Sequence, residues 1–195
     1  MFPLEAAPAF VRAAAAHLDL FGLLGLCFGF AAGLMPQRRL ILLCSAGCGL
    51  CFSAHFLRLG SPTGTAMNLI AVAQCLLAAR FVTALGRPAW LDAAFAAFFL
   101  LAAGLTLATW NGLPSVFAGA ATLVATAARL QASPQVMRLL LIGAALGWAV
   151  HNLLVGSVYG LTCDCLGLLG LTASLLRERA AERFPASTLG PVPSH

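Results

Sequence analysis

HFLRLGSPTG at residues 55–64 and HNLLVGSVYG at residues 151–160 are two versions of one pattern. With an offset of 96 residues, five positions are identical, and they pair as His55/His151, Leu57/Leu153, Gly60/Gly156, Ser61/Ser157 and Gly64/Gly160. The match extends backwards to Gly47/Gly143 and Leu50/Leu146. Identity at a fixed spacing predicts that one structural unit occurs twice in the chain.

The composition around these stretches is that of a membrane protein. The 195 residues are 61% hydrophobic and 9% charged, with a mean hydropathy of +0.95. A soluble domain carries about 25% charged residues, so this chain has too few charges to cover a surface in water. The same hydrophobicity excludes a disordered chain. We therefore expect an all-α fold, a polytopic membrane helical bundle.

Seven apolar runs approach the length of about 20 residues that crosses a bilayer. The predicted transmembrane spans are residues 19–35, 40–59, 65–84, 89–110, 113–130, 137–155 and 159–176. The predicted organisation is an N-terminal interfacial segment (1–18), a three-helix repeat (19–86), a linker transmembrane helix (87–112), a second three-helix repeat (113–177) and a cytoplasmic, partly disordered tail (178–195). Pro36-Gln37 and Pro134-Gln135 are expected to close the first and fifth spans.

The basic residues predict the orientation of these spans. All eleven are Arg, and they stand singly or in pairs between apolar runs, which favours topology anchors over a nucleic-acid groove. Seven spans put two of them, Arg12 and Arg58, on one side of the membrane. The other nine fall on the opposite side: Arg38, Arg39, Arg80, Arg87, Arg129, Arg138, Arg177, Arg179 and Arg183. The positive-inside rule then places the amino terminus outside and the carboxyl terminus in the cytoplasm.

The number of spans fixes how the two repeats relate. Three spans invert the direction of the chain, and one linker span inverts it again, so both repeats enter the membrane in the same direction. Parallel repeats of this kind occur in some transporters, whose substrate sites lie at the repeat interface near the bilayer midplane. A duplicated three-helix unit is also simply a stable way to build a bundle, so the repeat alone leaves the function open.

Asp164 and Asn68 occupy equivalent positions in the two repeats. A carboxylate at bilayer depth costs roughly 2.5–3.5 kcal/mol on insertion scales, which should turn Asp164 towards a cavity or a partner. Asn68 should face the same central volume. The functional interpretation is a group for proton coupling or solute binding, and the alternative is an acid near the outer interface with access to water.

Five further polar or aromatic residues are candidates to line a central site. His55 and His151 should lie about one turn from the outer ends of their helices. There they either face each other and titrate, or each caps its helix end or bonds a backbone carbonyl of the Gly-rich turn that follows. Gln74 is near the middle of a span and should face inwards, with interhelical hydrogen bonding as the alternative. The others are Asn152 and Trp148.

No motif points to a cofactor, a metal or an enzyme. The seven cysteines lie in apolar runs, where Cys behaves as a small hydrophobe, and helix packing explains them better than metal binding. The chain has no GxSxG, Walker or HExxH motif. We therefore expect no catalytic residues.

The stretch WAVHNLLVGSVYG at residues 148–160, followed by Asp164 and Arg177, resembles the carboxyl-terminal signature of the YgjV family of bacterial inner-membrane proteins. Arg38-Arg39 and residues 55–60 fit the same family, and the resemblance covers most of residues 15–180. It implies a bacterial inner-membrane location and no particular activity. The acid at position 164 is more often Glu in that family, and its Asn-rich stretch reads Leu171 to Ser174 here. More distantly, the layout of three, one and three spans is similar to that of SWEET and PQ-loop transporters.

The sequence thus predicts a multi-pass protein of the bacterial inner membrane whose partners are the lipid bilayer and a small polar solute. The preferred function is a transporter-like carrier with Asp164 and Asn68 lining a central cavity and the histidines at its outer mouth. The alternative is a non-transporting structural or assembly protein, in which those polar groups would be sealed in side-chain hydrogen bonds. The sequence leaves self-association into a homo-oligomer open.

Overall fold

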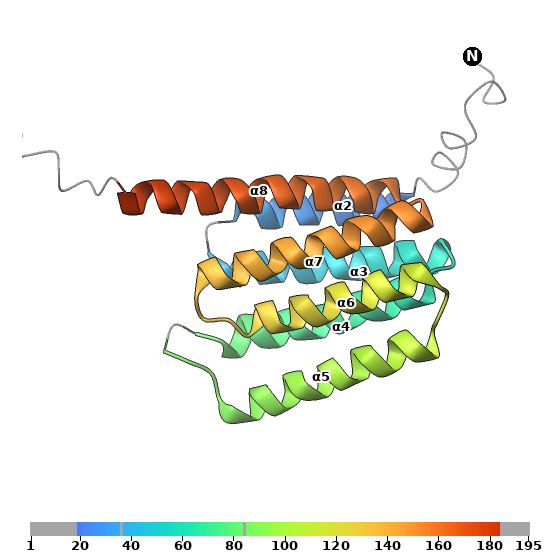
Figure 1. Ribbon diagram of the computed structural model, residues 1–195, viewed down its shortest axis with the longest axis horizontal. Helices are drawn as coiled ribbons and strands as arrows, with labels where there is room; N and C mark the ends of the chain where they lie inside the picture. The colour runs from blue at the N-terminus through green and yellow to red at the C-terminus, as the bar shows by residue number, and fades with distance from the viewer. Residues whose placement is uncertain (1–18, 36, 84, 184–195) are drawn as a thin grey trace, which may run out of the picture.

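The computed structural model describes residues 19–35, 37–83 and 85–183, and these residues form seven α-helices. The helices are α2 (Leu20–Leu34), α3 (Arg38–Arg58), α4 (Pro62–Phe81), α5 (Ala89–Ala108), α6 (Leu113–Arg129), α7 (Pro134–Val155) and α8 (Val158–Arg183) (Figure 1). The predicted all-helical bundle is confirmed. The predicted interfacial segment and most of the predicted tail lie outside the described residues.

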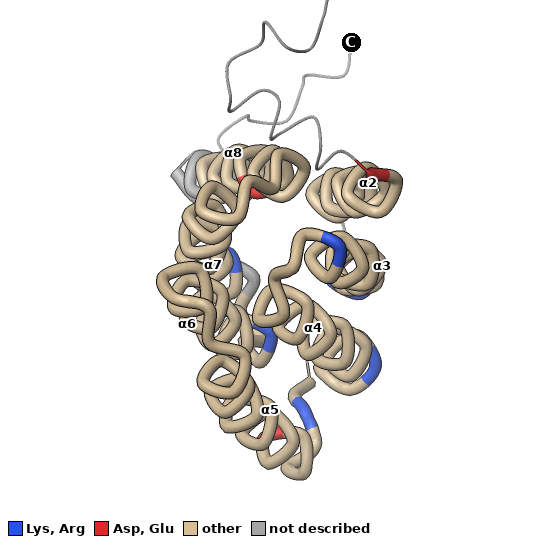
Figure 2. Tube along the Cα trace, turned by 90° about the vertical axis from the view of Figure 1, so that its right-hand side faces the viewer, with Lys and Arg blue, Asp and Glu red and all other residues tan. Residues whose placement is uncertain are grey.

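The helices form two columns that run side by side. In the end-on view of Figure 2, α2, α3 and α4 make one column, and α8, α7 and α6 make the other in the opposite order. The columns touch where α2 meets α8 and where α4 meets α6, and α5 packs against α4 and α6 at the foot of the pair. Successive helices alternate in direction, so α2, α3 and α4 run parallel to α6, α7 and α8 respectively (Figure 1).

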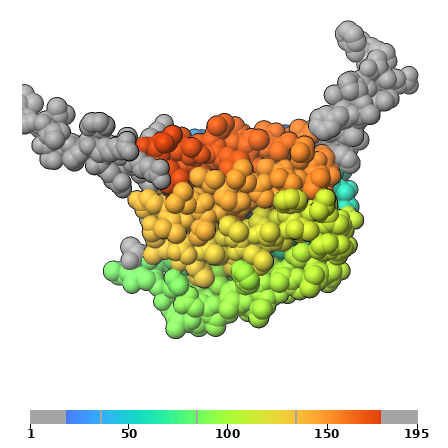
Figure 3. Space-filling view, viewed as in Figure 1, coloured from blue at the N-terminus to red at the C-terminus, as the bar shows by residue number. Residues whose placement is uncertain are grey.

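Large apolar side chains face outwards and small or polar ones face inwards. Leu100, Leu107 and Leu169 are 73%, 72% and 68% exposed. In the space-filling view, side chains fill the spaces between α5, α6, α7 and α8 (Figure 3). The buried residues instead include many of small or polar type, among them Ala78, Ala102, Ala118, Ala128, Ser53, Thr63, Ser115, Thr122 and Thr126. This distribution suits a solvent of lipid tails, in which small residues allow close helix approach and polar groups bond across helices.

Five of the helices are long and apolar enough to cross a membrane, and α2 and α6 are shorter apolar helices. With 15 and 17 residues, these two are about 22 and 26 Å long at 1.5 Å per residue. A bilayer core is about 30 Å thick. α2 and α6 are each the first helix of their column in chain order, so each column begins with a short helix.

Several helix boundaries differ from the predicted spans because polar side chains cap the helices. Ser133 accepts a hydrogen bond from the backbone N–H of Val136, which starts α7 at Pro134 rather than at residue 137. The Pro134-Gln135 pair therefore opens the sixth helix, and the prediction that it closes the fifth is wrong. Proline suits the first turn of a helix, where its missing N–H has no partner to lose.

The two Gly-Ser turns of the repeated pattern have the same backbone geometry. Gly60 and Gly156 follow α3 and α7 in the left-handed region, with φ of 68° and 73°. In each turn the backbone N–H of the serine donates to a carbonyl near the end of the preceding helix. Ser61 donates to the carbonyl of Phe56 and Ser157 to that of Asn152, both at an N···O distance of 2.9 Å. This is the Schellman arrangement, in which glycine avoids the clash that a Cβ would make.

The serines then start the following helices. Ser61 Oγ accepts from the backbone N–H of Gly64 at 3.3 Å, and Ser157 Oγ accepts from that of Gly160 at 3.1 Å. A serine hydroxyl at this position satisfies one of the unpaired N–H groups of a helix start. The Gly-Ser pair thus ends one helix and begins the next, as the sequence predicts.

Arg38 ties three helices together at the opposite end of the bundle, which also carries Arg80 and Arg129 and is called the arginine end below. Its guanidinium Nη1 donates to the carbonyls of Ala78 and Val82 at 3.1 and 3.2 Å, and Nη2 donates to the carbonyl of Arg129 at 2.9 Å. These carbonyls belong to the last turns of α4 and α6, where helices leave acceptors unpaired and favour a positive charge.

We predict that Gly60→Ala destabilises the protein by about 1–2 kcal/mol, because an alanine is strained in the left-handed region even though its Cβ would meet no atom within 4 Å. Gly104→Ala is the matched control. A Cβ there also meets nothing within 4 Å, but Gly104 lies inside α5, so this change should stabilise by up to about 1 kcal/mol. Thermal unfolding in detergent measures both, and equal shifts would contradict the turn geometry.

Candidate functional site

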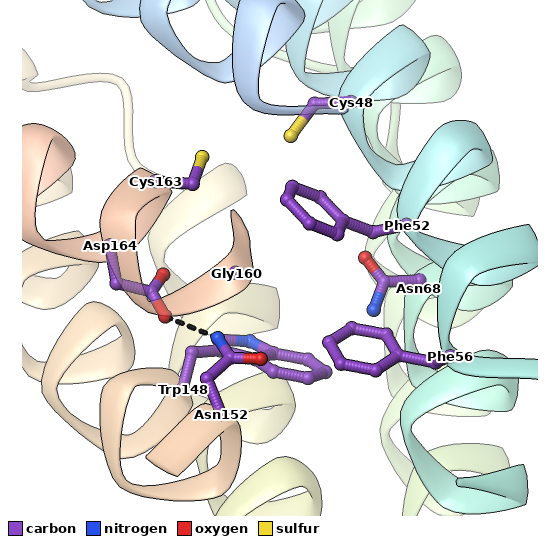
Figure 4. Close-up of a pocket in the computed structure, with 9 residues that line it drawn as sticks. All are labelled: Cys48, Phe52, Phe56, Asn68, Trp148, Asn152, Gly160, Cys163 and Asp164. Atoms are coloured by element: carbon purple, nitrogen blue, oxygen red, sulfur yellow. Dashed lines mark hydrogen bonds between the residues drawn. The ribbon is translucent and has the colours of Figure 1, made fainter. Parts of the chain in front are cut away.

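A pocket lies between the two columns, about halfway along α3. Its volume is about 110 Å³, and it is shown in Figure 4. One column supplies Cys48, Phe52, Phe56 and Asn68, and the other supplies Trp148, Asn152, Gly160, Cys163 and Asp164. The structure therefore brings Asp164 and Asn68, the equivalent polar positions of the repeated pattern, to opposite sides of one cavity. Trp148 and Asn152 join them there.

Asp164 is held by an amide on the neighbouring helix. Asn152 Nδ2 donates to Asp164 Oδ2 at 2.6 Å, which joins α7 to α8. Within the described part of the chain, Oδ2 is the carboxylate oxygen that takes part in a hydrogen bond, and Oδ1 is left to the pocket. Asn152 is 3% exposed, and its Oδ1 is buried without a partner among the described residues.

Asn68 uses its donor on its own helix. Its Nδ2 donates to the carbonyl of Gly64 at 2.9 Å, one turn earlier in α4. A carbonyl can only accept, so this bond fixes which end of the amide is nitrogen. The remaining polar atom of Asn68 is Oδ1, a hydrogen-bond acceptor, on the side of the pocket opposite Asp164 (Figure 4).

Three aromatic rings line the pocket between these polar groups. Phe56 stacks on Trp148 with ring centroids 6.0 Å apart, and Phe52 stacks on Phe56 with centroids 5.9 Å apart. These rings line the cavity together with the side chains of Cys48 and Cys163. The cavity thus combines one carboxylate, two amides, two thiols and three aromatic rings.

A second pocket continues from the first towards the arginine end. Its volume is about 260 Å³, and it shares Trp148, Cys163 and Asp164 with the first pocket. Small residues on α2 and α8 leave this space open, among them Gly29, Ala32, Gly33, Gly167 and Gly170. Arg129 and Arg138 line it further along, near the end of α6 and the start of α7. Asp164 therefore stands where the two spaces meet.

The opposite end of the bundle, called the histidine end, is closed by a chain of polar contacts. His55 is fully buried, and its Nε2 lies 2.9 Å from Ser157 Oγ at the start of α8. Its Nδ1 lies 3.0 Å from Asp19 Oδ2, just before α2. The imidazole of His55 therefore joins α3 to the starts of α2 and α8.

Asp19 is an ionised acceptor in this chain of contacts. Burial raises its pKa, but hydrogen bonds from the backbone of Gly22 and from His55, and the charges of His55 and Arg58, outweigh burial and hold the pKa below its ordinary value. An ionised carboxylate can only accept, so His55 Nδ1 carries a proton.

His151 takes the equivalent position in the other column. Its Nδ1 donates to the carbonyl of Pro114 at the start of α6, at 2.8 Å. Its Nε2 points at the other Gly-Ser turn, since a Cβ placed on Gly64 would lie 3.0 Å from it. The atom is buried and has no hydrogen-bond partner among the described residues. His55 thus reaches the turn of the other column, whereas His151 bonds the start of α6 in its own column.

The histidines do not line the cavity mouth that the sequence predicts. Both are 0% exposed and lie behind the pocket wall. The ring of Phe56 separates them, with its centroid 5.6 Å from that of His55 and 5.2 Å from that of His151. The predicted alternative, a cap on the histidine's own helix or a bond to a carbonyl of the turn that follows it, does not describe these contacts either, since His55 contacts Asp19 and Ser157 and His151 contacts Pro114.

Gln74 is also placed away from the pocket. It is fully buried, its Nε2 donates to Thr126 Oγ1 at 2.8 Å, and its Oε1 accepts from Arg129 Nη1 at 2.6 Å. Both side-chain groups are used in holding α4 against α6. The prediction that Gln74 lines the site is therefore replaced by its alternative, interhelical hydrogen bonding.

Sequence reasoning missed the aromatic and thiol walls. Cys48, Phe52 and Phe56 recur every four residues and so share one face of α3. That spacing was the available signal, but it is equally typical of ordinary helix packing. Asp19 was missed as a partner of His55 because a charge at a span end needs no special explanation.

Comparison with known families matches residues 17–182 to the model Imp-YgjV, described as a bacterial inner membrane protein. No curated protein and no solved structure matches the chain.

We predict that Ser157→Ala lowers the free energy of unfolding by about 1–3 kcal/mol, because it leaves His55 Nε2 buried without a partner. It also removes the cap that Ser157 provides for α8. Thr162→Ala is the control in the same helix, since that hydroxyl is exposed and bonds only to the carbonyl of Val158. Its effect should stay within about 0.5 kcal/mol. Denaturant unfolding in detergent measures both free energies of unfolding. Equal changes in the two variants would contradict the contact between Ser157 and His55.

Proposed function

The chain belongs to the Imp-YgjV family of bacterial inner membrane proteins, and on that premise we propose that it is a carrier for a small polar solute. The solute site is the pocket between the columns. The observation that carries the proposal is the placement of Asp164 on this pocket, with one carboxylate oxygen bonded to Asn152 and the other left to the cavity.

The cost of a carboxylate inside a membrane supports a functional role for Asp164. Ionisable groups within spans are expensive, face cavities or partners, and mark solute or ion pathways. Had the protein needed only a stable helix contact between α7 and α8, a small neutral residue would have provided it without that cost.

A duplicated architecture also supports a carrier. We take α2–α4 and α6–α8 as the two predicted repeats, with α5 as the linker and all seven helices crossing the membrane. Their parallel directions and the matching backbone geometry of their Gly-Ser turns favour this assignment. Transporters with parallel repeats place their substrate site between them, where a small rocking motion exposes it to either side.

The two ends of the bundle suggest the state of this carrier. The histidine end is closed by buried contacts, and the second pocket leads from Asp164 towards the arginine end. With the orientation that the arginines predict, the arginine end faces the cytoplasm. The structure then corresponds to a carrier closed to the outside, with its solute site connected towards the inside.

The competing function is a non-transporting assembly protein. That function expects Asp164 and Asn68 to be fully satisfied by neighbouring side chains, as Gln74 is by Thr126 and Arg129. The free acceptors of Asp164 and Asn68 favour the carrier instead.

Asp164→Asn tests the proposal in proteoliposomes that hold the purified chain. The probes are radiolabelled methylammonium, glycine, glycerol and acetate, which differ in charge at similar size. We expect uptake of at least one probe above protein-free liposomes, and a loss of tenfold or more of that uptake in Asp164→Asn. Asp92→Asn is the control, because Asp92 pairs with Arg87 outside the pocket. Uptake of no probe, or equal uptake by the Asp164→Asn variant, would contradict the proposal.

Cys163 and Cys165 test whether the pocket is reached by water. Cys163 lines both pockets, while Cys165, two residues further along α8, is exposed on the outer surface and would meet lipid. Thiols react as thiolates, which need water. Chains that retain one of these two cysteines should therefore differ tenfold or more in their reaction rate with 2-aminoethyl methanethiosulfonate in proteoliposomes, with Cys163 faster. Equal rates would exclude a wet pocket.

A further inference from the structure

We propose that the pocket between the columns binds a small organic cation, an ammonium-bearing solute whose charged group lies between Asp164 and the aromatic rings. The inference rests on the proposed function and names the class of its solute.

The hydrogen-bonding groups of the pocket call for a donor. Asn152 spends its Nδ2 on Asp164, and Asn68 spends its Nδ2 on the carbonyl of Gly64. The carbonyl of Gly64 and the ionised carboxylate of Asp164 can only accept, so the amide atoms that bond to them are the nitrogens. The pocket then presents acceptor oxygens, namely the carboxylate of Asp164 and Oδ1 of Asn68. An ammonium group carries only donors and complements this set.

Asn152 positions the carboxylate. Its Oδ1 is buried against Gly160, and no hydrogen bond to it exists within the described residues. Its Nδ2 donates to Asp164 Oδ2 and so holds the carboxylate at the pocket.

The aromatic rings suit a positive charge. The rings of Phe52, Phe56 and Trp148 line the cavity beside Asp164. Ring faces carry partial negative charge and attract ammonium groups, and indole does so most strongly. A neutral polar solute would gain little from these faces, and an anion would be repelled by them as well as by the carboxylate.

Basic residues lie outside this cavity. The lining of the pocket contains no Arg, Lys or His among its described residues. Arg129 and Arg138 line the second pocket at the arginine end, and Arg129 Nη1 is bonded to Gln74. An anion bound beside Asp164 would therefore have no positive side chain on the wall of its own cavity.

The volume limits the size of the cation. A cavity of about 150 Å³ holds a benzene molecule, so the 110 Å³ of this pocket corresponds to about four or five non-hydrogen atoms by the same measure. Methylammonium and tetramethylammonium fall at or below this limit, and they differ in that the second offers no N–H donor.

Isothermal titration calorimetry on the purified full chain in detergent tests the inference with four probes. These are methylammonium, tetramethylammonium, acetate and tert-butanol, the last being an uncharged molecule of similar size. We expect methylammonium to bind at least tenfold more tightly than acetate or tert-butanol. Tetramethylammonium should bind more weakly than methylammonium, since the acceptors around Asp164 would stay unpaired.

Two variants separate the carboxylate from the rings. Asp164→Asn should weaken methylammonium binding at least tenfold, and Trp148→Leu should weaken it about threefold. The controls are Asp92→Asn and Trp110→Leu, which change the same residue types outside the pocket and should bind like the parent chain. Thermal unfolding of each variant shows that the fold is retained.

The outcomes separate this inference from the carrier proposal. Cation binding without uptake of any probe in proteoliposomes would support the site and overturn the carrier. Uptake of glycine, glycerol or acetate that depends on Asp164, with no cation binding, would overturn the cation site and leave the carrier standing. Equal binding of acetate and methylammonium, or unchanged binding by Asp164→Asn, would also overturn the inference.

Discussion

A polar group inside a membrane must find its partner within the protein, and the architecture of this chain depends on that constraint. Lipid tails cannot accept or donate hydrogen bonds, so polar side chains gather between the helices while leucines turn outwards. Most of these polar groups join helices that are distant in the sequence. His55 reaches Ser157, Gln74 reaches Thr126, and Arg38 reaches the end of α6. The bundle is held by these contacts, by close packing of small residues, and by buried clusters that include Leu91, Phe95 and Met67.

Polar contacts are arranged differently at the two ends of the bundle. At the histidine end, Ser61 and Ser157 are buried, and His55 reaches Ser157 from the other column. At the arginine end, Arg38 binds the ends of α4 and α6 but leaves α2, α7 and α8 untied, and the second pocket lies between those helices. The same pair of columns is therefore closed at one end and hollow towards the other, an asymmetry that the duplicated sequence pattern alone would not produce.

The amides that line the pocket are only partly satisfied, and buried polar atoms without a partner also occur outside it, at Arg38, Thr122 and His151 among the described residues. Elsewhere in the described bundle a buried amide such as Gln74 has partners for both of its groups. Asn68 and Asn152 spend their nitrogens on neighbouring groups and keep their oxygens, and Asp164 keeps one carboxylate oxygen. Incomplete satisfaction is costly in a low-dielectric interior. It is understandable where a ligand completes the set, and this is the physical basis for assigning the solute site to this pocket.

The sequence alone determined the helical membrane class, the family and the Gly-Ser turns, because hydropathy and turn chemistry act over short stretches of chain. It also put Asp164 and Asn68 at equivalent positions, which the fold brings to one cavity. It could not decide between the two interpretations of His55, His151 and Gln74, since each depends on which atoms of distant helices lie within 3 Å. Only the tertiary structure turned Phe52 and Phe56 towards Asp164 and buried the histidines behind them, because the facing of a helix is set by its neighbours rather than by its own residues.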